Sequence, residues 1–74
     1  MNAYTSQQDQ RVYRITLRGQ IDAEFMEAYC PPETVLAGEG GAAILSNIHA
    51  DQAGIVGLVR HLHNLGYTIL ALES

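Results

Sequence analysis

The chain has 74 residues, a length that supports one small domain, because hydrophobic cores divide only in much longer chains. Eight acidic residues oppose four basic ones, and the net charge of −4 disfavours non-specific binding to nucleic acid. A single cysteine, Cys30, cannot form an internal disulfide. Because neither a signal peptide nor an apolar run of membrane-spanning length is evident, we expect a cytoplasmic protein with no membrane partner.

Apolar residues are abundant relative to charged ones. Hydrophobic residues make up 47% of the chain and charged residues 16%, whereas soluble domains usually carry about 25% charged residues. So small a domain cannot bury all of this apolar surface, and we expect a homo-oligomer, preferably a dimer, that hides the remainder in an interface. The alternative is a monomer whose exposed faces consist of small Gly and Ala residues.

The first predicted elements follow a polar start. Residues 1–10 show no sustained period, which predicts a disordered N-terminal tail. From Arg11 to Ile21 apolar and polar residues alternate, which is typical of a half-buried strand. One face of this strand carries Arg14, Thr16 and Arg18.

A short helix should follow over residues 23–29. Asp22 suits its N-cap, and Pro31 and Pro32 prevent its continuation. Residues 33–38 and 41–48 then form two short apolar runs joined by "EGG", whose glycines suit a tight hairpin turn.

A longer helix is predicted from its cap at Asp51 to Leu65, with Gly66 as the left-handed residue that ends it. Its apolar stripe should pack on a sheet and consists of Ile55, Leu58, Val59, Leu62 and Leu65. A last strand is expected over residues 67–73.

This order of elements predicts the α+β class and a ferredoxin-like βαββαβ sandwich over residues 11–74. Right-handed crossovers would give the strand order 4-1-3-2, with both helices on one face of a four-stranded antiparallel sheet. The second face of the sheet would then carry no helix, and Arg14, Thr16 and Arg18 would lie on it.

The three histidines have no spacing that predicts a metal or catalytic site. His61 and His63 are two residues apart and project about 160° from each other on a helix, so they cannot bind one ion together. His49 is expected just before the Asp51 cap, near a helix N-terminus. We therefore predict no metal, no cofactor and no catalytic residue, and structural roles for the histidines and for Cys30.

The strongest candidate site is the arginine-bearing face of the first strand. Arg14 and Arg18 could bind a small anionic ligand or the acidic residues of a partner, with Thr16 between them. A solvated polar strand face is the equal alternative. An RNA platform of this topology needs aromatic side chains on that face, and Tyr13 points to the other one.

Two stretches carry a resemblance. "YRITLRGQID" and "DQAGIVGLVRHLHNLGYTILAL" make residues 12–72 resemble a group of widespread small bacterial proteins of mostly unassigned activity. Members often carry His at the position of Val56, so no role of that imidazole transfers to this chain. The second stretch is also similar to the ligand-binding turn of ACT domains, although in that family it follows the first strand. The most specific shared residues are Asp51, Gln52, Ala53, Gly57, Leu58, Leu62, Leu65 and Gly66, followed by Arg18 and Gly19.

The resemblance implies a stand-alone cytoplasmic domain and no particular reaction. We therefore expect a non-enzymatic interaction or regulatory module that dimerises through the uncovered sheet face or an edge strand. The alternative is a small-molecule enzyme of the dimeric α/β-barrel type, with a cavity between two sheets. Its polar groups would come from Arg14, Thr16 and Arg18, with Ser46 or Asn47, because no acid or histidine can be assigned to that face from the sequence.

Overall fold

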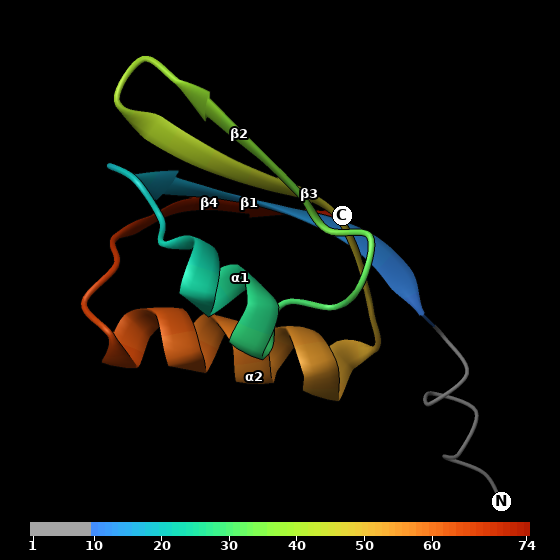
Figure 1. Cartoon of the computed structure of the whole chain (residues 1–74). Coiled ribbons are helices and arrows are strands. Elements are labelled where there is room, and N and C mark those ends of the chain that lie inside the picture. The colour runs from blue at the N-terminus through green and yellow to red at the C-terminus, as the bar shows by residue number, and fades with distance from the viewer. Residues whose placement is uncertain (1–9) are drawn as a thin grey trace, which may run out of the picture.

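The computed structural model describes residues 10–74 as an α+β domain (Figure 1). Residues 1–9 of the predicted N-terminal tail lie outside this range. The predicted class and order of elements are confirmed. The strands are β1 (Arg11–Arg18), β2 (Val35–Glu39), β3 (Ala42–Ala50) and β4 (Ile69–Glu73), and the helices are α1 (Ala23–Tyr29) and α2 (Gln52–Asn64).

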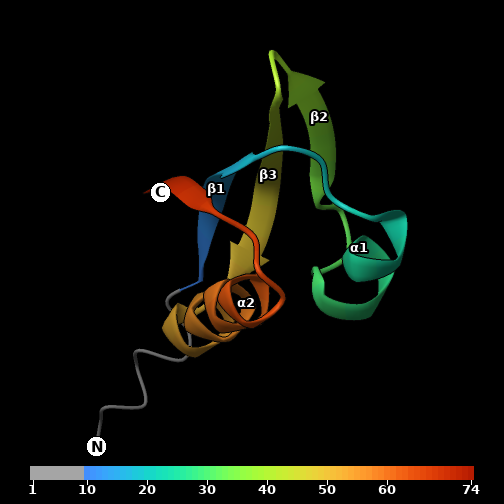
Figure 2. The same ribbon diagram turned by 90° about the vertical axis from the view of Figure 1, so that its left-hand side faces the viewer.

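The four strands form one antiparallel sheet in the order β2-β3-β1-β4, which reads β4-β1-β3-β2 from the other edge. Both helices lie on the same side of this sheet (Figure 1). In the rotated view, α1 lies toward the β2 edge, and α2 lies beneath β1 and β3 (Figure 2). We call the side without helices the open face. Neither helix is long and apolar enough to cross a membrane.

Alternation along β1 divides its side chains between the two faces. Ile15 and Leu17 are fully buried beneath the helices, while Arg14 and Arg18 are exposed on the open face and Thr16 is half-buried there. The strand ends before Gly19, three residues earlier than the predicted end at Ile21. Gly19 has a φ of 86°, which leaves the extended region, and its N–H donates to the Gly41 carbonyl at 2.7 Å.

Glycines form the turn between β2 and β3 as predicted. Gly40 and Gly41 have φ angles of 57° and 82°, and they connect the paired residues Glu39 and Ala42. Two consecutive left-handed residues are the requirement of a type I′ hairpin turn, and glycine adopts them without steric cost.

Helix α1 begins and ends where the sequence predicts. Asp22 precedes it in extended geometry but makes no side-chain hydrogen bond to the helix. Its carbonyl accepts from the N–H groups of Phe25 and Met26 at 3.1 and 3.3 Å. The helix stops at Tyr29, because Cys30 is extended ahead of the two prolines.

Helix α2 has the predicted cap at each end. The Asp51 Oδ1 accepts from the Gly54 N–H at 2.8 Å, and Gly66 takes the left-handed φ of 91°. The prediction that Leu65 belongs to the buried stripe is wrong, because its side chain is 59% exposed. Leu65 follows the last helical residue, and its ψ of 4° lies off the helical geometry that aligns the stripe.

A single apolar core fills the space between sheet and helices. Among residues 10–74 no polar or charged side chain is buried, so the buried contacts between the side chains of the two layers are apolar. The core consists of Ile15, Leu17, Ile21, Phe25, Ala43, Leu45, Ile48, Ala50, Ile55, Leu58 and Leu62.

Replacing Leu62 by Ala should lower the free energy of unfolding by about 2–5 kcal/mol, because it leaves a cavity around a fully buried side chain. The matched change Leu65→Ala should cost less than about 0.5 kcal/mol. Urea unfolding followed by circular dichroism, at one protein concentration, measures both values. Equal losses would contradict the observed burial.

Replacing Asp51 by Ala should lower the free energy of unfolding by about 1 kcal/mol, because it removes the side-chain acceptor of the α2 cap. Asp22→Ala is the matched control, since Asp22 makes no such bond at α1. The same urea titration should separate the two variants, and a larger loss for Asp22→Ala would refute the difference between the caps.

Candidate functional site

The open face carries all three residues that the sequence singled out. Arg14, Thr16 and Arg18 alternate along β1 with the buried Ile15 and Leu17, so the three side chains share that face. Because β1 is one of the two inner strands, they lie in the middle of the sheet.

Small and apolar residues cross the centre of the open face. Thr16 is paired with Ile44 on one side and with Ala71 on the other, and Ile44 is paired with Ala37 on the edge strand. We call these four residues the central row. Thr16, Ile44 and Ala71 are half-buried although no helix covers them. The centre of the open face therefore carries no charged side chain and only small or branched side chains.

Charged residues lie on both sides of the central row. Toward the β2–β3 turn, Arg18 is paired with Ala42, which is in turn paired with Glu39. Toward the other end, Arg14 is paired with Glu73, and their side chains form an ion pair with 3.9 Å between Nη1 and Oε1. Both of these side chains are about 60% exposed, so the pair contributes little stability.

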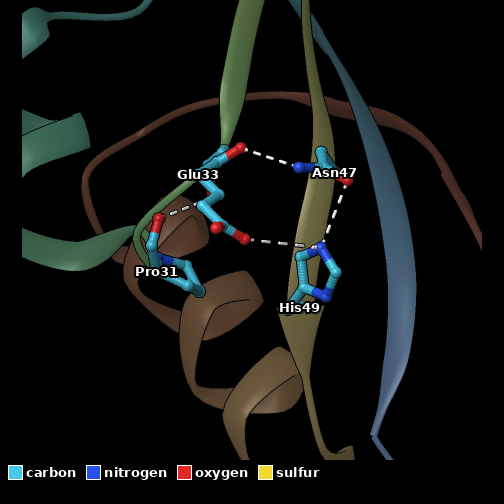
Figure 3. A network of polar contacts seen from close by, with 5 residues as sticks. Pro31, Glu33, Asn47 and His49 are labelled. Atoms are coloured by element: carbon cyan, nitrogen blue, oxygen red, sulfur yellow. Dashed lines mark hydrogen bonds and ion pairs between the residues drawn. The ribbon is translucent and has the colours of Figure 1, made fainter.

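A β-bulge in β3 lies opposite Arg14. Tyr13 is paired with Ile48 and Ile15 with Leu45, so Arg14 alone faces both Ser46 and Asn47. Asn47 adopts the left-handed φ of 58°. The bulge turns its side chain toward the loop between α1 and β2 (Figure 3).

Three polar side chains meet at this bulge, and we call Glu33, Asn47 and His49 the bulge cluster (Figure 3). The Asn47 Nδ2 donates to the Glu33 carbonyl at 3.0 Å. The other end of the same amide, Oδ1, lies 3.2 Å from the His49 Nε2. The His49 Nε2 also lies 3.9 Å from the Glu33 Oε1. An acid and an imidazole from two distant parts of the chain thus face each other at the end of the sheet.

Glu33 reaches this position through a tight turn. The Thr34 N–H donates to the Pro31 carbonyl at 3.3 Å, and Glu33 has a φ of 76°. These features match a type II turn with Pro32 at its second position, where the third position favours Gly or Asn. Glutamate at that position therefore costs conformational energy.

His49 lies just before the Asp51 cap as predicted, but that prediction did not give the strand face on which it lies. It is the penultimate residue of β3, and its pairing with Val12 places it on the open face. From the sequence no histidine or acid could be assigned to that face, whereas the structure places His49, Glu39 and Glu73 there, with Glu33 beside His49. Alternation of Asn47 and His49 with the buried Ile48 and Ala50 was the available signal for His49. No sequence signal pointed to Glu33.

An open depression of about 360 Å³ lies at this end of the face. Arg14, Ser46, Asn47 and Glu73 supply its polar groups, and its other lining residues are Val12, Tyr13 and Ser74. A single chain leaves the depression open to solvent. Small-molecule sites usually enclose most of their ligand, so a second molecule would be needed to close it.

The remaining histidines lie on α2 and remain apart from the bulge cluster. The ring of His61 stacks on Tyr29 with 4.3 Å between centroids, and His63 is exposed. Within the described range, no group of three or more His, Cys, Asp or Glu side chains could hold a metal ion.

Cys30 follows α1 and packs against it. Its Sγ lies 3.7 Å from the Met26 Sδ, and burial raises the pKa of its thiol above the ordinary value. At neutral pH the thiol is therefore protonated, and the protonated form is a poor nucleophile. This arrangement gives Cys30 a packing contact with Met26.

The native Cys30 thiol should react with a disulfide reagent more slowly than the same thiol in the urea-unfolded chain, because burial disfavours the thiolate. The absorbance of the thiolate that the reagent releases gives the rates for the native and the unfolded chain, each over a series of pH values. The native rate should rise at higher pH than the unfolded rate. A native rate equal to or above the unfolded rate would show that the thiol is activated.

The comparisons with known proteins identify a family. A family model described as Domain of unknown function (DUF8691) matches residues 12–73. No curated protein and no solved structure matches the chain significantly. The matched range includes the central row and the bulge cluster, and the family description names no activity or ligand. Because the match covers most of the chain, the protein belongs to the family described as Domain of unknown function (DUF8691).

Proposed function

We propose that this protein is a small interaction or regulatory module that forms a homodimer through its open face. The order of elements, the strand order and the one-sided helix layer support a ferredoxin-like sandwich. The open face of such a sandwich is a surface that a second sheet can cover. The observation that carries the proposal is the uncharged central row with opposite charges on one side of it.

The central row suits contact between two sheets. Sheets that pack face to face lie about 10 Å apart and fill the space with small and branched apolar side chains. Ala37, Ile44, Thr16 and Ala71 supply such a surface across all four strands. Val35 extends it along β2, and Val12 lies on the same face beyond Arg14; both valines are about half exposed.

The charges favour one orientation of the second copy. A two-fold axis parallel to the strands places β1 of one copy over β3 of the other, because these are the two inner strands. Arg18 of each copy then lies over Ala42 of the other, with Glu39 of that copy on one side and its Arg18 on the other. A two-fold axis perpendicular to the strands would instead oppose Arg18 and Arg14 of the two copies. Complementary charges select the first orientation.

The open face also carries side chains that would bind a regulatory ligand. Arg14 and Arg18 are exposed guanidinium groups, and such groups bind carboxylates and phosphates through paired hydrogen bonds. A small anionic ligand or an acidic protein partner would bind there in competition with the second copy or beside it.

One observation favours a second candidate, an enzyme of the dimeric α/β-barrel type. The bulge cluster and the depression beside Arg14 place polar groups at one end of the face that would enclose the cavity. A dimer crystal structure distinguishes the candidates: sheets in direct contact support the module, and an enclosed cavity above about 300 Å³ supports the enzyme.

Exchanging the charges of Arg18 and Glu39 tests the proposed dimer. The molecular mass of the wild type measured by sedimentation should be twice that of the single chain, which is 8.1 kDa. Arg18→Glu and Glu39→Arg should each weaken the dimer at least about tenfold, because each opposes like charges across the interface. The double variant should regain most of the affinity, because it restores opposite charges in reversed positions.

Arg60→Glu is the matched control for Arg18→Glu, since Arg60 is exposed on α2 and both substitutions change the net charge by the same amount. Sedimentation velocity over a range of concentrations measures all four variants and the wild type. A monomeric wild type, or a double variant that dissociates like the single ones, would reject the proposed interface.

A further inference from the structure

Another open depression, of about 350 Å³, lies in the helix layer between α1 and the loop that joins α2 to β4. Three aromatic side chains and two acidic ones line it. From this combination we propose that the depression binds a small organic cation of the quaternary-ammonium class. The site lies on the helix side of the sheet (Figure 2) and shares no residue with the proposed interface, so it does not depend on the dimer.

The aromatic rings form the floor and two sides of the depression. The centroid of the Phe25 ring lies 4.9 Å from that of Tyr29 and 5.7 Å from that of Tyr67. Because Phe25 is buried and both tyrosines are more exposed, Phe25 forms the floor and the tyrosines form the sides. The rings meet at 43° and 66°, so these three rings do not cover one another by parallel stacking. The exposed Leu65 borders the same space.

One side of the depression is supported from α2. The ring of His61 stacks on Tyr29 with 4.3 Å between centroids and 31° between planes. His61 does not line the depression. The stack therefore holds Tyr29 in place from outside the space that the ligand would occupy.

Asp22 and Glu24 bring two negative charges to the depression. The Asp22 side chain makes no hydrogen bond to α1, and within residues 10–74 neither carboxylate forms an ion pair. No arginine or histidine of that range lines the depression. Two full charges exceed the partial charge of about +0.5 at the start of a helix. The net charge of −4 adds to the attraction for a cation.

The two kinds of side chain select the class of ligand. The faces of aromatic rings attract cations electrostatically, and aromatic sites of this kind recognise quaternary ammonium groups. A hard metal ion would need several converging oxygen ligands, and an uncharged apolar ligand would gain nothing from the carboxylates. The volume suits a small molecule, because ligand pockets begin at about 300 Å³.

Choline chloride titrated into the full chain tests the site, with the backbone amide shifts followed by NMR. The amides around the depression should shift along a saturable curve, and sodium chloride at the same concentrations should not reproduce it. The uncharged isostere of choline, 3,3-dimethylbutan-1-ol, should bind at least about fivefold more weakly, because it lacks the charge that the rings and the carboxylates attract.

Two pairs of variants test the rings and the carboxylates separately. Tyr67→Leu should weaken choline binding at least about threefold, whereas Tyr67→Phe keeps the ring and should bind like the wild type. Asp22→Asn should also weaken binding at least about threefold. Glu27→Gln is its matched control, because it removes the same charge from α1 outside the depression and should change binding less.

The amide spectrum of each variant shows whether it is folded, and the pair at Asp22 and Glu27 decides alone if Tyr67→Leu is not. Shifts that sodium chloride reproduces, or equal binding of choline and the alcohol, would overturn the proposal. Unchanged binding by folded Tyr67→Leu, or equal losses in Asp22→Asn and Glu27→Gln, would also overturn it.

Discussion

The helices α1 and α2 pack on the same face of the sheet, and this constraint determines what the other face must present. Apolar side chains from both layers occupy the space between them, and no polar side chain is buried among the described residues. Each inner strand consequently directs every second residue away from the core. On β1 those residues are Arg14, Thr16 and Arg18, and β3 contributes Ile44 beside them. The candidate interface is thus a consequence of how the core is built.

Irregular backbone modifies this simple alternation at one end of the sheet. A regular β3 would place Asn47 on the face of the core, where an unpaired amide is costly. The bulge opposite Arg14 accommodates it, and the amide bonds to Glu33 and His49. The type II turn at Glu33 brings the loop to the same place. Among residues 10–74, the two non-glycine residues with a left-handed φ, Glu33 and Asn47, are therefore in contact with each other.

The apolar surplus of the composition is spread over several surfaces. Val12 and Val35 belong to the open face, while Leu36, Leu70 and Leu72 lie on the edge strands, and Val56 and Leu65 lie on or beside α2. A dimer through the open face would cover the central row together with Val12 and Val35, and it would leave the leucines and Val56 exposed. The composition therefore indicates that apolar side chains remain exposed after folding, but the fold determines where on the surface they lie.

The sequence by itself determined the order of the elements, the ends of α1, the caps of α2 and the two faces of β1. Local chemistry sets these features: alternation in β1, the glycines at 40, 41 and 66, the Asp51 cap and the two prolines after α1 all act within a few residues. Only the tertiary structure decided the bulge at Asn47, the exposure of Leu65 and the meeting of Glu33 with His49. These features depend on the register between strands and on the path of a loop, and both arise from contacts between residues far apart in the chain.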